Sequence, residues 1–450
     1  MTRRYFFRSY RRFYRLRRWF RARVSPGGRL LFGAVIASGV FGVDVRKSFA
    51  YQIFALCLSL VLVAFVGAAL TRGKFAIRRS FPRFATRGER FVYEAEITNL
   101  GKRAAGGVRV REDPVVRLPT FEHFDGVREP GFAERNWFDR YMGYPRWAWL
   151  IRLCEGVCVE EFSVPVLEPG ETVSLRLALI PNRRGQISFR GLSLLVPEPL
   201  GLVRRIFRVS SPGSVLVLPR IVALPRLELG HGRRRPTVGA ADRNTFGGVD
   251  EFKRLREFRP GDALRRIDWR ASARLGEPMV KEFHDEHQGG LTVYLDTDAT
   301  RYSEAFEDAV TAAASLVCAA PPDVSAEVAL VRPHRGHGSG ELVQARGRES
   351  ALMTLASVNA QPLSPEDQRR VVERSFKSEM VLAILQQWDP GRAALIDALR
   401  RRVEGRVLVA VMREPGSAPL AELPCLRGDQ LARDLREFLA RALRETPKAA

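Results

Sequence analysis

The chain has 450 residues and a formal net charge of +23, with 73 Lys and Arg against 50 Asp and Glu. This length gives room for two or three domains, and the basic excess favours an anionic partner such as a membrane surface or nucleic acid. Five Cys residues are too few and too scattered for a small disulfide-stapled secreted domain. Cys154 and Cys158 lack a second pair, so we expect reduced thiols and no structural zinc site.

Residues 1–29 form a basic, aromatic arm with eleven Arg and no acidic residue. At helical spacing most of its apolar residues gather on one side and many Arg on the other, as in helices that lie on anionic lipid. Nucleic-acid binding and a disordered topology signal are the alternatives. Because an apolar segment follows directly, we expect lipid and no nucleic acid. The arginines expected at the membrane surface are Arg4, Arg8, Arg11, Arg15 and Arg18.

Residues 30–70 contain two apolar runs, residues 30–43 and residues 48–70, with a short charged loop between them. The second run has 23 residues, enough to span a bilayer core with some tilt. The first has 14, but no cleavage site of small residues follows it, which disfavours a signal peptide. We therefore predict a two-helix transmembrane hairpin. Arg and Lys outside the loop outnumber those within it, so the positive-inside rule predicts that both termini are cytosolic.

Residues 75–224 change to short alternating apolar runs with turns between them, which predicts an immunoglobulin-like β-sandwich. An aromatic insertion at about 114–159 interrupts the strands. Through Trp147 and Trp149 it could lie at the bilayer interface. The slightly preferred alternative is a lid helix packed on the sandwich. No set of residues in this domain has the pattern of a catalytic site.

Residues 225–290 comprise a polar linker and then a segment, residues 249–283, dense in charges of both signs around a Pro-Gly-Asp turn. This signature segment resembles the domain of unknown function 58 family. We expect a structural network of Arg–carboxylate pairs, pinned to the core by Ile267 and Trp269. An anion site or a partner-protein site is the alternative. The residues singled out are Arg256, Glu257, Gly261, Asp262, Arg265, Ile267, Asp268, Trp269 and Arg274.

Residues 291–450 alternate apolar strands with helices, which predicts a doubly wound parallel sheet whose ligands bind at the carboxyl ends of the strands. Asp296, Asp298 and Thr300 follow the first strand, and Asp389 follows a later one. This arrangement resembles a degenerate von Willebrand factor A domain, and the resemblance implies a tentative Mg²⁺ site at these four residues. The Asp-x-Asp-x-Thr spacing also resembles haloacid-dehalogenase-like phosphatases, but the other motifs of that class are missing.

The expected fold class is therefore multidomain α+β: a transmembrane hairpin, a β-sandwich and a von Willebrand factor A-like α/β domain. Resemblance to the domain of unknown function 58 family implies a MoxR-type AAA+ ATPase as partner. We expect a non-catalytic adaptor anchored in the bacterial cytoplasmic membrane. A cation-dependent ligand-binding module and a phosphohydrolase are the alternatives. The chain contains no Gly-Lys-Ser/Thr phosphate-binding loop, so ATP hydrolysis would belong to the partner.

Overall fold

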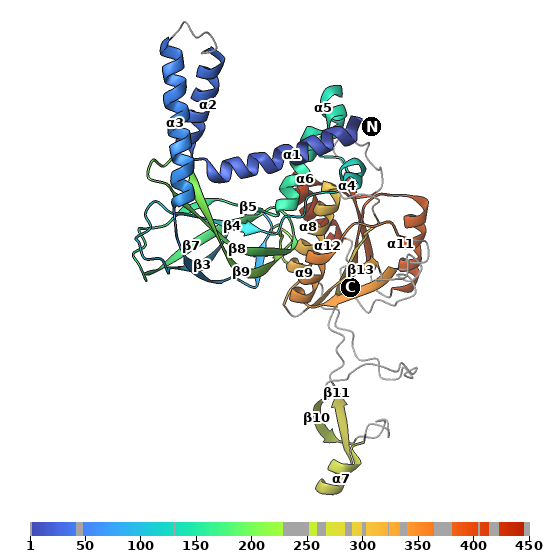
Figure 1. Cartoon of the computed structure of the whole chain (residues 1–450). Helices are drawn as coiled ribbons and strands as arrows, with labels where there is room; N and C mark the ends of the chain where they lie inside the picture. The colour runs from blue at the N-terminus through green and yellow to red at the C-terminus, as the bar shows by residue number, and fades with distance from the viewer. Residues whose placement is uncertain are drawn as a thin grey trace.

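The computed structural model describes residues 2–41, 48–129, 131–227, 252–258, 267–283, 290–298, 303–322, 324–333, 340–363, 380–403, 406–413 and 423–444. These form N-terminal helices, a two-sheet β domain with a helical insertion, a small strand pair and an α/β domain (Figure 1). The predicted mixed α+β multidomain class is confirmed.

Three helices open the chain: α1 (Thr2–Arg23), α2 (Pro26–Phe41) and α3 (Ser48–Leu70). The helices α2 and α3 lie side by side, and α1 runs across their base (Figure 1). Among the described helices, α3 is long and apolar enough to cross a membrane, through Tyr51–Leu70 with a mean hydropathy of 2.8; the apolar part of α2, Pro26–Val40, is shorter. Both apolar runs are thus helical, and their insertion into a bilayer stays a prediction.

Two antiparallel-rich sheets form the β domain. One has the order β1-β3-β7-β5 and the other the order β2-β9-β8-β4-β6. In β3, inward-facing Tyr93, Ala95 and Ile97 are buried and alternate with exposed Glu94 and Glu96, as the period-two pattern predicts. Side chains of both sheets share one hydrophobic core, which makes this domain a β-sandwich. The strands are β1 (Phe75–Ser80), β2 (Phe84–Thr86), β3 (Phe91–Asn99), β4 (Arg109–Pro114), β5 (Val157–Cys158), β6 (Glu161–Ser163), β7 (Thr172–Pro181), β8 (Gly185–Pro197) and β9 (Arg204–Leu218).

The aromatic insertion is helical and packs against α1. Trp147 is buried, and the rings of Phe7 and Tyr14 in α1 meet it edge-on at centroid distances of 5.4 and 6.4 Å. Trp147 is therefore covered by the arm and not exposed at an interface. The alternative of a lid helix packed on the sandwich stays a prediction. The insertion comprises α4 (Phe121–Gly126), the short 3₁₀ helix η1 (Phe132–Glu134), α5 (Trp137–Met142) and α6 (Tyr144–Glu155).

The turn between β8 and β9, residues 198–203, holds the base of the helical pair. The Leu202 carbonyl accepts a 3.0 Å hydrogen bond from the Ser25 amide, just before α2. Val203 of the turn packs with Ala64 and Ala68 of α3, and Arg205, at the start of β9, donates to the Ala69 carbonyl at 2.5 Å. The Glu198 carboxylate orders the turn by accepting the amides of Leu202 and Val203. One turn thus fixes the start of α2 and the end of α3.

The α/β domain is built on a six-stranded sheet in the order β14-β13-β12-β15-β16-β17, parallel except for the antiparallel edge strand β14. Every residue of β12 and β15 is buried, because α8, α9 and α12 cover one face and α11 covers the other. The predicted doubly wound arrangement is therefore present. Its elements are β12 (Gly290–Leu295), α8 (Glu304–Ala319), β13 (Ser325–Pro333), β14 (Gly340–Arg346), α9 (Arg348–Ser357), β15 (Met380–Leu385), α11 (Pro390–Arg402), β16 (Arg406–Arg413), β17 (Cys425–Arg427), η3 (Gly428–Gln430) and α12 (Leu431–Arg444).

A buried ion-pair cluster joins the β-sandwich to the α/β domain. Arg184, in the turn before β8, pairs with Glu307 of α8 and also donates to the Leu355 and Val358 carbonyls at the end of α9. Arg87 of the sandwich reaches the other oxygen of Glu307 at 2.8 Å. The Arg184 and Glu307 side chains are only 6% and 5% exposed, so the two domains share a desolvated contact.

The signature segment contributes a separate small element: β10 (Phe252–Glu257), α7 (Trp269–Leu275) and β11 (Met279–Phe283). The strands β10 and β11 pair antiparallel, and α7 contacts β11. This signature element is drawn apart from both domains in Figure 1.

We predict that Gly28→Ala weakens the contact between the helical pair and the β8–β9 turn. A Cβ at Gly28 would lie 2.2 Å from the Leu202 carbonyl oxygen, so the backbone must move, at a cost of about 1–3 kcal/mol. The melting temperature of the detergent-solubilised protein and the rate of tryptic cleavage after Arg204 or Arg205 would measure this. Gly33→Ala in the same helix is the control, since nothing lies within 4 Å of that position. Equal effects of both substitutions would contradict the close approach.

We predict that Glu307→Ala destabilises the protein by about 3–5 kcal/mol, because Arg184 would stay buried without its carboxylate. The midpoint of urea unfolding measures the loss, and faster proteolysis between the domains would locate it. Glu304→Ala, an exposed position in the same helix, should cost less than about 1 kcal/mol. A loss at Glu307 no larger than this control would mean that the cluster does not hold the domains together.

Candidate functional site

The carboxyl edge of the α/β sheet gathers the predicted site residues. The strands β12 and β15 are parallel neighbours, so the segments that follow them start at the same edge. Asp296 and Asp298 follow β12, and Asp389 follows β15 as the N-cap of α11. Thr300 lies outside the described residues. Three of the four predicted metal ligands therefore do come together, as sequence spacing alone indicates.

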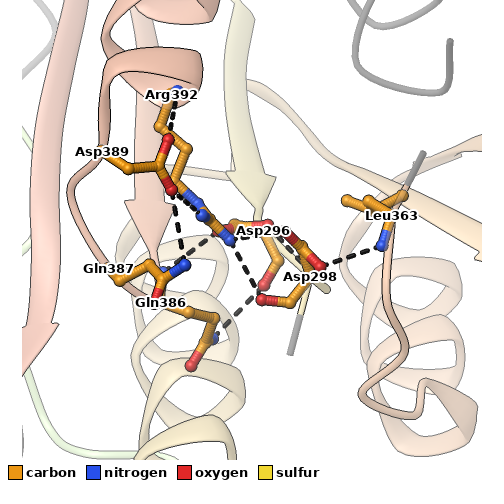
Figure 2. Close-up of polar contacts among 7 residues, drawn as sticks. All are labelled: Asp296, Asp298, Leu363, Gln386, Gln387, Asp389 and Arg392. Atoms are coloured by element: carbon orange, nitrogen blue, oxygen red, sulfur yellow. Dashed lines mark hydrogen bonds and ion pairs between the residues drawn. The ribbon is translucent and has the colours of Figure 1, made fainter. Parts of the chain in front are cut away.

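Arg392, in the first turn of α11, lies between these carboxylates (Figure 2). Its Nε is 2.7 Å from Asp296 Oδ2, and its Nη2 is 2.9 Å from Asp298 Oδ2. Its Nη1 bonds to Asp389 Oδ2, and the Arg392 side chain is 3% exposed. One guanidinium thus satisfies three carboxylates through its planar fork of donors.

Helix geometry explains how Arg392 reaches this position. Asp389 Oδ1 accepts the Arg392 backbone amide at 2.9 Å, as an N-cap does, and Pro390 supplies the first helical residue. The side chain three residues after the cap then returns over the helix N-terminus toward the sheet. The N-terminus of α11 stabilises the negative charge of nearby carboxylates, and the Arg392 guanidinium offsets the repulsion among the three of them.

The remaining carboxylate oxygens also have partners. Asp296 accepts the amides of Asp298 at 2.9 Å and Gln386 at 3.2 Å, while Asp298 Oδ1 accepts the Leu363 amide at 2.9 Å (Figure 2). Each oxygen of Asp296 and Asp298 thus already accepts at least one hydrogen bond. Among the residues that the structure describes, no group of three or more His, Cys, Asp and Glu side chains is arranged to hold a metal ion.

Arg392 thus lies among three residues of the tentative Mg²⁺ site, Asp296, Asp298 and Asp389, and occupies the space between their carboxylates. The fourth residue, Thr300, lies outside the described residues, so the Mg²⁺ site stays a prediction that these contacts disfavour. The same contacts bear on the phosphatase alternative. A nucleophilic Asp296 would have to leave a buried ion pair before it could attack a phosphoryl group.

Proton affinities in the cluster follow from burial and charge. Burial raises the pKa of the Asp296 carboxyl, opposed by Arg392 and by the two backbone amides. Burial also acts to raise the pKa of Asp389, but the hydrogen bonds from the amide and guanidinium of Arg392 bring it below its ordinary value. Burial acts to lower the pKa of Arg392, yet the carboxylates outweigh this and raise it. The guanidinium accordingly stays charged.

The signature element assigns different roles to the residues singled out in the sequence. Asp268 is the N-cap of α7 and accepts the amides of Arg270 and Ala271, both at 3.1 Å. The Ser272 hydroxyl donates to the Asp268 carbonyl at 2.7 Å and accepts the Met279 amide at 2.8 Å, tying α7 to β11. The Asp268 and Ser272 positions thus build the fold of this element.

Trp269 differs from its prediction, because 69% of the residue is exposed and it does not pin the element to a core. Ile267 is half-buried beside Val280, with which it forms an isolated bridge. Glu257 and Arg274 are exposed. Arg256 lies in β10, and its side chain is not among those described; Gly261, Asp262 and Arg265 lie outside the described residues.

The arm arginines divide between protein and solvent. Arg18 pairs with Asp113 of β4 at 3.4 Å, and the guanidinium of Arg4 lies 5.1 Å from the centre of the Phe121 ring. Arg8, Arg11 and Arg15 are exposed. The arm is therefore partly a protein-docking helix, which helical periodicity alone did not reveal. The aromatic richness of the insertion was the available signal for it.

Residues 254–351 match the family described as "Protein of unknown function DUF58". The matched region includes β12 with Asp296 and Asp298, and ends before Arg392. The chain is also similar to the "Uncharacterized protein YeaD" of Bacillus subtilis (strain 168), with 24% identity over 165 residues. That match covers 36% of this chain and 39% of the relative, so the chain spans well under half of the relative's length.

Among solved structures, the CARDB domain of the PF1109 protein from Pyrococcus furiosus is 14% identical, covering 32% of this chain and 89% of that one, with a TM-score of 0.18. The β-glucosidase from Listeria innocua is also 14% identical, covering 32% of this chain and 16% of that one, with a TM-score of 0.17. Superpositions this poor carry no argument about fold or function.

We predict that Arg392→Ala lowers stability by about 3–5 kcal/mol, because it leaves buried carboxylates without their counter-charge. Arg400→Ala, an exposed position in the same helix, should change stability by less than about 1 kcal/mol. Thermal unfolding of both variants checks this. Millimolar Mg²⁺ should not shift the melting temperature of the unaltered protein, and such a shift would contradict the placement of Arg392.

We predict that Asp389→Asn destabilises the protein in a pH-dependent way. The folded pKa of Asp389 is depressed, so its stabilising effect is fully present above the unfolded carboxyl pKa of about 3.9 and is lost as the pH falls through the folded value. The difference in melting temperature between the two proteins should therefore shrink on acidification below about pH 4. Asp397→Asn, an exposed position in the same helix, should show a smaller difference. A difference that grows toward low pH would contradict the assignment.

Proposed function

We propose that this protein is a non-catalytic adaptor of the domain of unknown function 58 family, anchored in the bacterial cytoplasmic membrane. In this proposal its α/β domain is a degenerate von Willebrand factor A-like domain and its β-sandwich is immunoglobulin-like. The observation that carries the non-catalytic assignment is the pairing of Arg392 with all three carboxylates at the sheet edge. Other α/β domains bind ligands at this edge of the sheet, whereas here the charged side chains at the edge form ion pairs with one another.

The alternatives fit this geometry less well. A cation-dependent module needs free carboxylate oxygens, and those of Asp296 and Asp298 are used by Arg392 and by backbone amides. A phosphohydrolase needs the same two side chains for nucleophilic attack and proton transfer. Freeing them would break a buried ion pair, so both readings require a rearrangement that the adaptor does not.

Membrane anchoring is supported by the arrangement of the helical pair. In the proposed topology α2 and α3 cross the bilayer as a hairpin and both termini are cytosolic. The start of α2 and the end of α3 are held by the same β8–β9 turn, so the N-terminal arm and the β-sandwich lie on one side of the hairpin. The excess of Arg and Lys on that side fits a cytosolic position. Lipid contact through the arm belongs to the same proposal.

A MoxR-type AAA+ ATPase is the proposed partner, and the signature element is the proposed contact. Exposed Trp269 supports this proposal. The hydrogen bonds of Asp268 and Ser272 hold α7 in place, so the large aromatic side chain of Trp269 is kept in contact with solvent, where a partner can reach it. Aromatic anchors supply much of the binding energy of protein interfaces. Exposed Arg270 and Arg274 on the same short helix would add charge complementarity to an acidic partner surface.

We predict that Trp269→Ala reduces capture of the ATPase at least tenfold, because loss of a buried aromatic anchor costs about 2 kcal/mol or more. The measurement is co-purification of the ATPase with the full membrane-embedded chain. The melting temperature should stay unchanged, because the side chain makes little contact within the chain. Trp137→Ala, another exposed tryptophan on a different helix, is the matched control and should leave capture unchanged. Undiminished capture by Trp269→Ala would exclude the signature element as the contact.

A further inference from the structure

The helices α1 and α5 expose apolar side chains that no described part of the chain covers. On α1, the rings of Phe7, Tyr10 and Tyr14 face the insertion and pack around Trp147. The apolar residues left exposed on α1 therefore project elsewhere. Together with three exposed aromatic residues of α5 they form a set that we name the aromatic footing: Phe13, Leu16, Trp19, Trp137, Phe138 and Tyr141.

Two α1 residues of the footing, Phe13 and Leu16, lie on the side of the helix that faces the hairpin. Phe13, Leu16 and Phe20 follow each other at spacings of three and four residues and so share a face. Phe20 meets Phe32 of α2 edge-on at a centroid distance of 5.4 Å. The exposed Phe13 and Leu16 therefore point toward the side from which α2 and α3 rise.

The α5 part is attached to the same helix. Tyr141 meets Phe6 of α1 edge-on at 6.3 Å, and the Tyr10 hydroxyl donates to the Met142 carbonyl at 3.2 Å. Figure 1 shows α5 on the side of α1 toward which the hairpin extends. Trp137, at the start of α5, is 77% exposed and Phe138 is 53% exposed. No packing within the described part of the chain buries these two side chains, and large exposed aromatic residues that gather in one place mark an interaction surface.

Charge accompanies this apolar surface. Arg8, Arg11 and Arg15 are exposed along the same helix, α1. Aromatic side chains with neighbouring arginines match the boundary between lipid headgroups and acyl chains, where rings sit among the headgroups and guanidinium groups meet lipid phosphates. An anionic bilayer complements both the apolar and the basic parts, whereas a soluble acidic partner would complement the second alone.

We infer that the aromatic footing rests in the headgroup region of the anionic bilayer that the hairpin crosses, with α1 in the membrane plane and α5 inserted deepest through Trp137 and Phe138. The inference depends on the proposed anchoring by α2 and α3. It adds a second, peripheral contact, reached because the β8–β9 turn fixes the hairpin relative to α1 and the insertion. The protein would then contact the membrane through α1 and α5 as well as through the hairpin of α2 and α3.

The test uses the full chain reconstituted into phosphatidylglycerol–phosphatidylcholine vesicles that contain lipid with a nitroxide near the headgroup. Tryptophan emission is recorded for the unaltered protein, Trp137→Phe and Trp269→Phe. We expect Trp137→Phe to remove emission that the nitroxide quenches, and Trp269→Phe to remove emission that only aqueous acrylamide quenches. Both residues are exposed, so neither substitution should disturb folding, and unchanged melting temperatures would verify this.

Three results would overturn the inference. Quenching of Trp137 by acrylamide alone would place α5 in water, and protection of Trp137 from both quenchers would mean that protein covers it. In either case a chain that still co-sediments with the vesicles after carbonate washing would keep the proposed anchoring. A chain that is released by carbonate would overturn the anchoring and the footing together. Capture of the ATPase is measured separately and depends on neither result.

Discussion

The pairing of Arg184 with Glu307 is the interaction on which the arrangement of this molecule depends. It lies where the β-sandwich meets α8 and α9, away from solvent, and the guanidinium also donates to two carbonyls that end α9. A buried charge that loses its partner is costly, so such a contact permits one relative placement of the two domains and penalises others. The β8–β9 turn extends the same fixed geometry to the helical pair.

Much of the fold could be predicted because its strongest signals are periodic. The strand β3 alternates buried and exposed residues because one of its faces is buried. The strands β12 and β15 are buried at every residue and mostly apolar because both of their faces are covered. A local signal also marks the start of α8, because Ser303 is a residue type favoured at N-caps and its side chain accepts the Phe306 amide. By contrast, the edge strand β17 has three residues, too few for a period to be recognised.

The sequence predicted the carboxylates of the candidate site but not the arginine that pairs with them. Asp296, Asp298 and Asp389 could be grouped, because the ends of parallel strands meet at one edge of a sheet. Arg392 was missed, because one arginine among 73 basic residues has no distinguishing spacing beyond its place three residues after an N-cap. Trp269 was expected in a core on hydrophobicity alone. Which aromatic residues of a charged segment face inward depends on contacts remote in sequence, and no local pattern encodes them.

Arg392 gives the α/β domain a counter-ion that is part of its own polypeptide. A bound divalent cation exchanges with the surrounding fluid, so its occupancy follows concentration and chelators can strip it. A side chain held by covalent bonds cannot leave, and a guanidinium keeps its charge at any pH that a cell tolerates. The charge balance that Arg392 provides at this edge of the sheet consequently does not depend on the concentration of a free cation.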